Sequence, residues 1–356
     1  MSISVEDSDW TILPTNRSAH VQGVHESLLQ ECEKDIIWYR ENFFGKPHYN
    51  YLGLETERGP IAISIVEGNE NWKVLVRTKT GSERLTVPTK SVPVPFLRKI
   101  FGLGPPLESV MQAASSNIPV SAVTLSRELA LPNELLAMEE RQVIRSYKFG
   151  VAYLTTGQTT EEEMLRNRTE RTSKAYQQFL SFLGERIELK GWKGYRAGLD
   201  TSASGNTGTH SIYTKWQSYE IMFHVATLLP YTEHEPQQVE RKRHLGNDIV
   251  LIVFQDPEAG KLRIKTVASK QNHVVAAVQP CPEGYRVQFV AKEGVLSFSP
   301  ELPEPTIIGT DATARDFFLH KLVNAERASY KAPSFAPKIQ RTRNVLLTDV
   351  CTKYAS

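Results

Sequence analysis

Cysteine is scarce in this sequence, and long apolar runs are missing. The three cysteines, Cys32, Cys281 and Cys351, lie far apart and never form a Cys-x-x-Cys pair. This pattern argues against a disulfide framework and a structural zinc site, and we expect buried thiols. No window approaches the ~20 uncharged apolar residues of a membrane-spanning helix, and the polar start lacks the apolar stretch of a signal peptide. The sequence therefore predicts a cytoplasmic protein without direct membrane insertion.

An excess of charge of one sign is also missing, because 42 Lys and Arg residues face 40 Asp and Glu residues. Such a balance produces no field that attracts nucleic acid. The short run Arg241, Lys242 and Arg243 has no interleaved aromatic residues, so it does not indicate nucleic-acid binding either. What the chain does contain is 40% apolar residues among 356, enough to fill the cores of two domains.

The first part of the chain divides into a leader and a small domain. Residues 1–23 are polar and unpatterned, and we expect a flexible leader. Residues 24–43 carry apolar side chains at helical spacing. Alternating runs at 61–66 and 73–77, separated by a polar turn, predict a β-hairpin. We therefore expect a smaller α+β domain over residues 24–145.

Residues 146–356 alternate strands with helices. The run at 249–254 is apolar on both faces and predicts a central strand, and Thr160 and Glu163 have the spacing of a capping box. These features predict a three-layer α/β domain with a mixed sheet over residues 146–356. We expect further strands at 148–154, 219–225, 273–278 and 285–290, and helices at 174–184, 236–244, 314–330 and 342–353.

One stretch stands out because a basic helix end leads through Gly246 and Asn247 directly into the central strand. Polar residues tied to a rigid strand are held in fixed positions, and such ends are where α/β proteins commonly build sites. A purely structural interpretation also exists, in which Lys242 and Arg243 offset the negative end of the helix dipole and the Gly-Asn pair makes a turn. Spacing alone favours this structural interpretation.

Several longer motifs follow one another from about residue 148 to 348. They are Phe149–Val151, Gly157–Glu163, Phe182–Gly184, Thr207–Ser211, Glu220–Val225, Leu229–Thr232 and, as Lys-Arg-His-Leu-Gly-Asn-Asp-Ile-Val, Lys242–Val250. In this order they closely resemble the catalytic domain of Rap GTPase-activating proteins. Shorter motifs at residues 38–40, 44–46 and 48–50 resemble the dimerisation domain that precedes the catalytic domain in that family. The motif at residues 195–201 resembles the signal-induced proliferation-associated branch of the family.

This resemblance implies a G-domain-like catalytic fold, a homodimer, and an activator of GTP hydrolysis on a Rap-type small GTPase in its GTP-bound form. In most small GTPases a glutamine orients the attacking water, and Rap-type GTPases lack it. The family inserts an asparagine, the Asn thumb, and the matching residue is Asn247. A carboxamide both accepts and donates hydrogen bonds, as glutamine does. The alternative for Asn247 is an asparagine in a left-handed turn after glycine.

The resemblance also assigns supporting roles. Lys242, Arg243 and His244 would orient the thumb helix and contact the GTPase, and Lys148 would support activity; the family does not use Arg243 as an arginine finger. From the residues alone, His244 is a core histidine and Lys148 a solvated lysine.

We expect neither a metal nor a cofactor. The histidines at 224, 234 and 244 lack the spacing of a helical metal pair, and Gly157 starts no Walker motif, so GTP and magnesium should be carried by the partner GTPase. This chain should not hydrolyse nucleotide alone, and partners would recruit it to membranes.

The loop over residues 256–273 departs from the family pattern, because Gln271 replaces a phenylalanine. This leaves two alternatives: an activator of another Ras-family GTPase, of Rheb or Ral type, or a non-catalytic dimeric scaffold that binds a GTPase.

Overall fold

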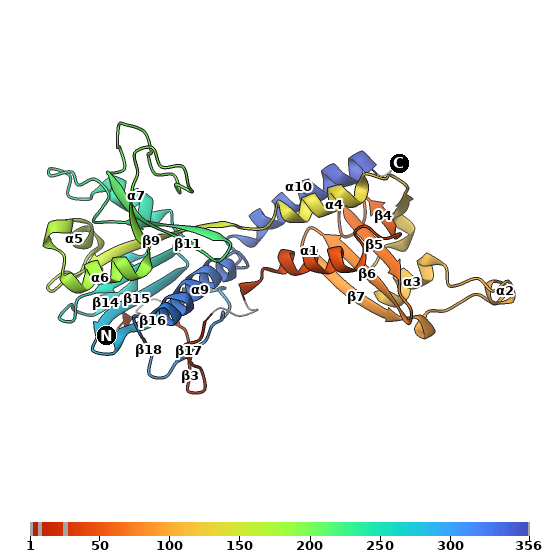
Figure 1. The fold of residues 1–356 in the computed structure, drawn as a ribbon, viewed down its shortest axis with the longest axis horizontal. Coiled ribbons are helices and arrows are strands. Elements are labelled where there is room, and N and C mark those ends of the chain that lie inside the picture. The colour runs from red at the N-terminus through yellow and green to blue at the C-terminus, as the bar shows by residue number, and fades with distance from the viewer. Residues whose placement is uncertain (1–2, 6–8, 24–27, 355–356) are drawn as a thin grey trace. The chain divides into compact units, whose positions relative to one another are not determined.

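The chain forms two compact units. The computed structural model describes residues 3–5, 9–23 and 28–354 (Figure 1). The larger unit contains residues 1–28 and 144–335, and the smaller unit contains residues 29–143 and 336–356.

A mixed sheet forms the middle layer of the larger unit. The neighbouring strands β12, β9, β13 and β15 run parallel, and the remaining pairs are antiparallel. Strand β13 lies between β9 and β15 with every residue buried, which confirms the predicted central strand. The strand order is β10 (Glu185–Glu188), β11 (His210–Trp216), β12 (Tyr219–Val225), β9 (Ser146–Leu154), β13 (Val250–Gln255), β15 (Val274–Cys281), β16 (Gly284–Lys292) and β18 (Ile307–Ile308).

Helices cover both faces of this sheet, so the predicted three-layer α/β architecture is confirmed. Helices α6 (Lys174–Leu183) and α9 (Ala312–Ser329) pack their apolar side chains on one face. Helices α5 (Glu161–Leu165), α7 (Val239–Gly246) and α8 (Ile264–Val267) contribute to the core on the other. Helix α5 begins with the predicted capping box.

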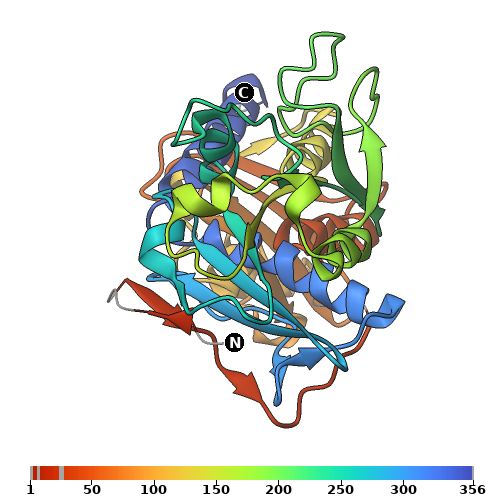
Figure 2. The same ribbon diagram turned by 90° about the vertical axis from the view of Figure 1, so that its left-hand side faces the viewer.

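The described part of residues 1–23 packs with the larger unit, where we expected a flexible leader. Strand β2 (Trp10–Ile12) pairs with the edge strand β16 (Figure 2). Trp10 and Leu13 are buried, each 7% exposed, so the few apolar residues of this segment fix it to the sheet. Two short parallel pairs add to this contact: β1 (Ile3–Ser4) with β14 (Leu262–Arg263), and β3 (Thr15–Asn16) with β17 (Leu302–Pro303).

The smaller unit is an antiparallel sheet with helices on both faces. Strands β5 and β6 form the predicted hairpin. Helices α1 (Glu31–Asn42), α4 (Leu131–Glu140) and α10 (Ala336–Tyr354) pack on one face, and α3 (Leu107–Ala114) packs on the other. Helix α1 begins later than the helix expected over 24–43, of which residues 24–27 lie outside the described residues. The strand order is β7 (Gly81–Pro88), β6 (Asn71–Thr78), β5 (Ile61–Glu67), β4 (Tyr49–Gly53) and β8 (Thr124–Ser126).

Helix α10 belongs to the smaller unit, although we expected residues 146–356 to form one domain. Arg343 of α10 donates to both carboxylate oxygens of Glu139 in α4, at 3.0 and 3.1 Å. Arg77 of β6 lies 3.3 Å from the same carboxylate, and both Arg77 and Glu139 are buried. Such a charge must stay paired once it is buried, so the three residues tie α10 to the sheet.

The three cysteines are free thiols. Cys351 is buried in α10, as predicted, but Cys32 and Cys281 are only half-buried. In the part of the chain that the structure describes, no helix is both long and apolar enough to cross a membrane.

Candidate functional site

An exposed asparagine and a fully buried aspartate stand side by side where α7 meets β13. Asn247 caps the end of α7 with φ −96° and ψ 0°, and its backbone N–H donates to the carbonyl of His244 at 3.2 Å. Asn247 is therefore not in the left-handed turn that the structural alternative proposed. Asp248 is 0% exposed, whereas the Asn247 side chain is exposed. Asp248 is thus anchored in the fold, whereas Asn247 beside it is exposed to solvent.

The buried Asp248 carboxylate contacts two nitrogen groups from neighbouring strands. The Lys148 ammonium of β9 lies 3.0 Å from Oδ1, and Nδ1 of His224 in β12 lies 2.9 Å from Oδ2. Lys148 Nζ also donates to the Asn247 carbonyl at 3.1 Å. The lysine thus contacts both residues of the turn, so it is not simply a solvated side chain.

His224 is oriented by acceptors at both ends of its ring. Its Nδ1 faces Asp248, and its Nε2 lies 3.0 Å from the carbonyl oxygen of Ala197. Each ring nitrogen thus faces an oxygen acceptor, which fixes the orientation of the ring. The Asp248 carboxylate therefore has the Lys148 ammonium on one side and the His224 ring on the other.

His244 lies on the buried face of α7, and its ring centroid is 5.0 Å from that of His224. Burial, followed by the charges of His224 and Arg243, lowers the pKa of His244 to about 4. The ring is therefore neutral near pH 7, and it is only 8% exposed. Among the described residues its Nε2 has no hydrogen-bond partner. These features match the core-histidine interpretation.

Arg241 is a buried cation whose importance the sequence analysis missed. Its guanidinium donates to the backbone carbonyls of Leu229, Pro230, Leu165 and Asn167, at distances between 2.6 and 3.2 Å. Burial lowers its pKa to about 10. A signal was available, because positions 241, 244 and 245 share one face of a helix and Leu245 is apolar. Arg241 therefore fixes α7 to the loops beside it.

Lys242 and Arg243 project from the outer face of α7. The Lys242 ammonium lies 2.6 Å from Glu161 of α5, and Arg243 pairs with Glu240 of its own helix at 2.7 Å. About half of each basic side chain remains exposed. The structure thus brings Lys148 and His244 into the cluster around Asp248, and leaves these two cations at its rim.

Two side chains from the loop before β15 hold the turn from the other side, and the sequence analysis missed them. Ser269 Oγ donates to the Gly246 carbonyl at 2.7 Å. Asn272 is buried, and its Nδ2 donates to the carbonyls of Leu245 and Asp248 at 3.1 and 2.6 Å. Both lie in the loop over residues 256–273. The departure of this loop from the family pattern was the signal in the sequence that could have drawn attention to them. This loop supports the end of α7.

The arrangement offers one exposed carboxamide on an anchored turn with cations nearby. Within the described ranges, no cluster of His, Cys, Asp and Glu is arranged to hold a metal ion. A carboxamide at this position can orient a water or another small polar group, because it both donates and accepts.

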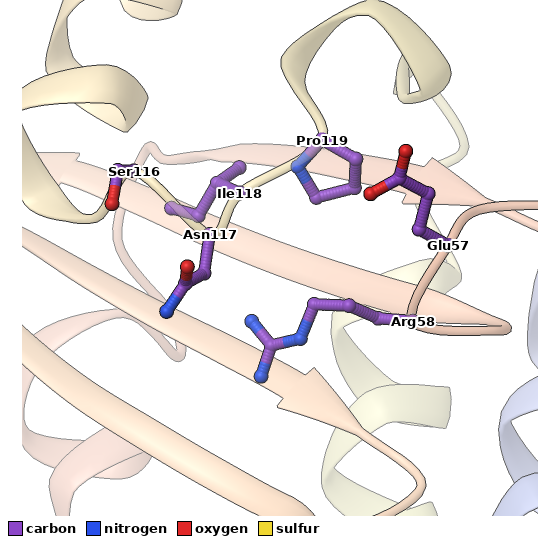
Figure 3. A pocket seen from close by; sticks show the side chains of 6 residues that line it. All are labelled: Glu57, Arg58, Ser116, Asn117, Ile118 and Pro119. Atoms are coloured by element: carbon purple, nitrogen blue, oxygen red, sulfur yellow. The ribbon is translucent and has the colours of Figure 1, made fainter.

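A separate pocket of about 340 Å³ lies in the smaller unit (Figure 3). Arg58 and Asn117 extend into it from two loops, and Arg58 is already paired with Glu83. None of the site residues predicted from the sequence lines this pocket.

Comparison with known proteins adds the family context. Residues 164–344 match the Rap/ran-GAP family, and residues 36–100 match the Rap/Ran-GAP protein dimerization domain. GTPase-activating Rap/Ran-GAP domain-like protein 3 of Gallus gallus is 39% identical over 92% of this chain and 35% of its own length. Signal-induced proliferation-associated 1-like protein 2 of Homo sapiens is 35% identical over 96% of this chain and 21% of its own length. The chain thus spans about a third or less of these two relatives.

A solved structure described as "Structure of the TSC2 GAP domain" is 33% identical, with a TM-score of 0.45, and the match covers 54% of this chain and 99% of that one. The Rap/ran-GAP match extends over half of the sequence and includes α7, Asn247, Asp248 and β13. With a match to the dimerization domain ahead of it as well, the chain belongs to the Rap/Ran-GAP family.

Proposed function

We propose that this protein stimulates GTP hydrolysis by a Rap-type small GTPase in its GTP-bound form, and that Asn247 is the group it supplies. The observation that carries the proposal is the exposed Asn247 carboxamide on a turn anchored by fully buried Asp248. Family membership and relatives whose names include "GTPase-activating" support the same activity.

Hydrolysis of GTP requires a water in line with the γ-phosphate, and a carboxamide can hold it. Asn247 would accept one hydrogen of this water through its oxygen and donate through its nitrogen, within the partner's active site. GTP and magnesium would be carried by the partner. An anchored group loses little freedom when the complex forms, so it can act mainly on the transition state.

The surrounding cations would have different tasks. Lys242 and Arg243 are exposed on the outer face of α7, where they can contact an acidic partner surface. Lys148 is bound to Asp248 and to the Asn247 carbonyl, so it would position the turn. His244 is buried in α7 and neutral, so it would help to hold this helix in place instead of acting as a general base.

The two alternatives remain testable in one assay. A Rheb- or Ral-type partner would use the same carboxamide, and only a panel of purified GTPases separates these from a Rap-type partner. A non-catalytic scaffold would bind a GTPase without changing its single-turnover hydrolysis rate. The exposed, anchored Asn247 favours catalysis over the scaffold. The proposed partner also implies a cytoplasmic location.

The first prediction concerns Asn247. Asn247→Ala should lower the activated single-turnover rate at saturation by roughly 10² to 10⁴, because the lost group acts in the transition state. Asn247→Asp should also fail, since a carboxylate cannot donate. Binding and melting temperature should be unchanged, and Asn117→Ala, an equally exposed position in the smaller unit, is the matched control. A rate within a few-fold of wild type would rule out the thumb role.

The second prediction separates contact from chemistry. Arg243→Ala should weaken the apparent affinity for the GTPase, and high protein concentration should restore most of the rate, because uniform binding does not alter the maximal rate. A concentration series of single-turnover curves measures this directly. If Arg243→Ala is inactive at saturation while Asn247→Ala keeps its activity, the protein supplies an arginine finger instead.

The third prediction tests the support of the turn. Ser269→Ala removes the donor to the Gly246 carbonyl, and one lost hydrogen bond of this kind corresponds to roughly 2- to 10-fold in the saturated rate. The apparent affinity for the GTPase should stay the same, since Ser269 does not belong to the exposed rim. A change confined to affinity would show that Ser269 belongs to the contact surface.

The fourth prediction concerns assembly. We propose that the smaller unit forms a homodimer, because residues 36–100 match a dimerization domain. Light scattering at several protein concentrations should give twice the chain mass of 40.2 kDa at the higher concentrations. A single chain mass at every concentration would contradict this proposal.

A further inference from the structure

A short segment of the smaller unit exposes an unusual amount of apolar surface. Residues 96–103, here called the α2 tip, comprise helix α2 (Phe96–Ile100) and the turn after it. The described residues include 15 exposed large apolar side chains, and five of them are concentrated in this tip. They are Phe96 at 77%, Leu97 at 68%, Ile100 at 61%, Phe101 at 74% and Leu103 at 52% exposed. Clustered apolar exposure of this kind marks an interaction site.

The α2 tip is a closed turn and not a loose chain. The Leu103 N–H donates to the Arg98 carbonyl at 2.8 Å, and Arg98 Nε donates to the Gly104 carbonyl at 2.8 Å. Gly102 has a φ of +64°, which lets the helix end there. No residue of α2 is buried. The backbone is therefore satisfied locally while the apolar side chains are exposed. The tip lies at the end of an arm that projects from the sheet of the smaller unit (Figure 1).

The charged residues of the segment that contains the α2 tip have one sign. From residue 85 to residue 107 the sequence contains Lys90, Arg98 and Lys99 and no aspartate or glutamate. Lys90 and Lys99 are exposed. Like charges repel, so these cations disfavour packing of two copies of this tip against each other. Apolar side chains combined with cations are instead suited to a surface that is apolar inside and anionic outside.

We propose that the α2 tip binds the surface of an anionic phospholipid membrane. Phe96, Leu97, Ile100 and Phe101 enter the boundary between headgroups and acyl chains, and Lys99 lies among the anionic headgroups. A projecting, convex segment suits a deformable lipid surface, whereas a protein partner would need a groove of matching shape. This site is separate from Asn247 and does not rest on the proposed GTPase activation. The proposal differs from the expectation, drawn from the sequence, that this protein has no direct membrane insertion.

Sedimentation of the full chain with lipid vesicles tests the proposal. The chain should bind vesicles of phosphatidylcholine mixed with phosphatidylserine, and bind much less to phosphatidylcholine alone. The double variant Phe96→Ser, Phe101→Ser should lose at least about tenfold in vesicle affinity, because both side chains leave the membrane boundary. Leu129→Ser is the matched control, since Leu129 is 94% exposed in the same unit but lies outside the tip.

A second pair of variants isolates the charge. Lys99→Gln should weaken binding to the anionic vesicles, whereas Lys79→Gln, an exposed lysine of the same unit outside the tip, should not. A Phe101→Trp variant gives a direct signal, because lipids with brominated acyl chains should quench its added fluorescence on binding.

Three outcomes would overturn the proposal. The first is an unmodified chain that does not sediment with the anionic vesicles, and the second is equal binding to both lipid compositions. The third is a double variant that keeps its vesicle binding but has an altered mass in light scattering, which would make the tip a contact between copies. GTPase activation measured in solution should be the same for all these variants, so failure here is distinguishable from failure of the proposed function.

Discussion

The burial of one carboxylate, Asp248, determines how the candidate site is built. A charge with no exposed surface is stable only when it is paired and hydrogen-bonded, and losing one partner of such a pair typically costs about 3–5 kcal/mol. Lys148 and His224 satisfy this requirement from β9 and β12, which flank each other in the sheet. Because Asp248 cannot move, its neighbour Asn247 has a fixed position and direction, although nothing buries its own side chain. The exposed carboxamide is thus positioned through the residue beside it.

Other buried polar groups extend this constraint to the whole of α7. Arg241 donates to four carbonyls from two other segments of the chain, and Asn272 donates to the carbonyls of Leu245, in the helix, and of Asp248, just after it. Each of these donors replaces water at a helix end or loop that would otherwise leave buried acceptors unpaired. The exposed face of α7, with Lys242 and Arg243, remains available because the buried face does the anchoring.

Much of this arrangement was predictable, and the rest depended on distant contacts. Periodic apolar runs correctly indicated β13, α6 and the β5–β6 hairpin, because each of these elements buries a face that its own sequence reveals. The resemblance identified the stretch around Asn247. Periodicity could not reveal that Lys148, 99 positions earlier, contacts Asn247. It also gave no sign that Trp10 adds an edge strand, or that α10 pairs with α4 through Arg343 and Glu139. Those contacts join residues far apart in sequence, and local propensity carries no information about them.

The smaller unit is assembled from both ends of the chain, with residues 144–335 inserted between its two parts. On the ribosome, the strands of the smaller unit and helix α4 are made before residues 144–335, but α10, which packs with α4 around Ala62 and Leu52, is made only after them. Until then Glu139 lacks Arg343, one of its two arginine partners, and the part of the sheet face that α10 packs on is uncovered. The nascent protein therefore completes its smaller unit last, so part of an apolar face is exposed while residues 144–335 are synthesised.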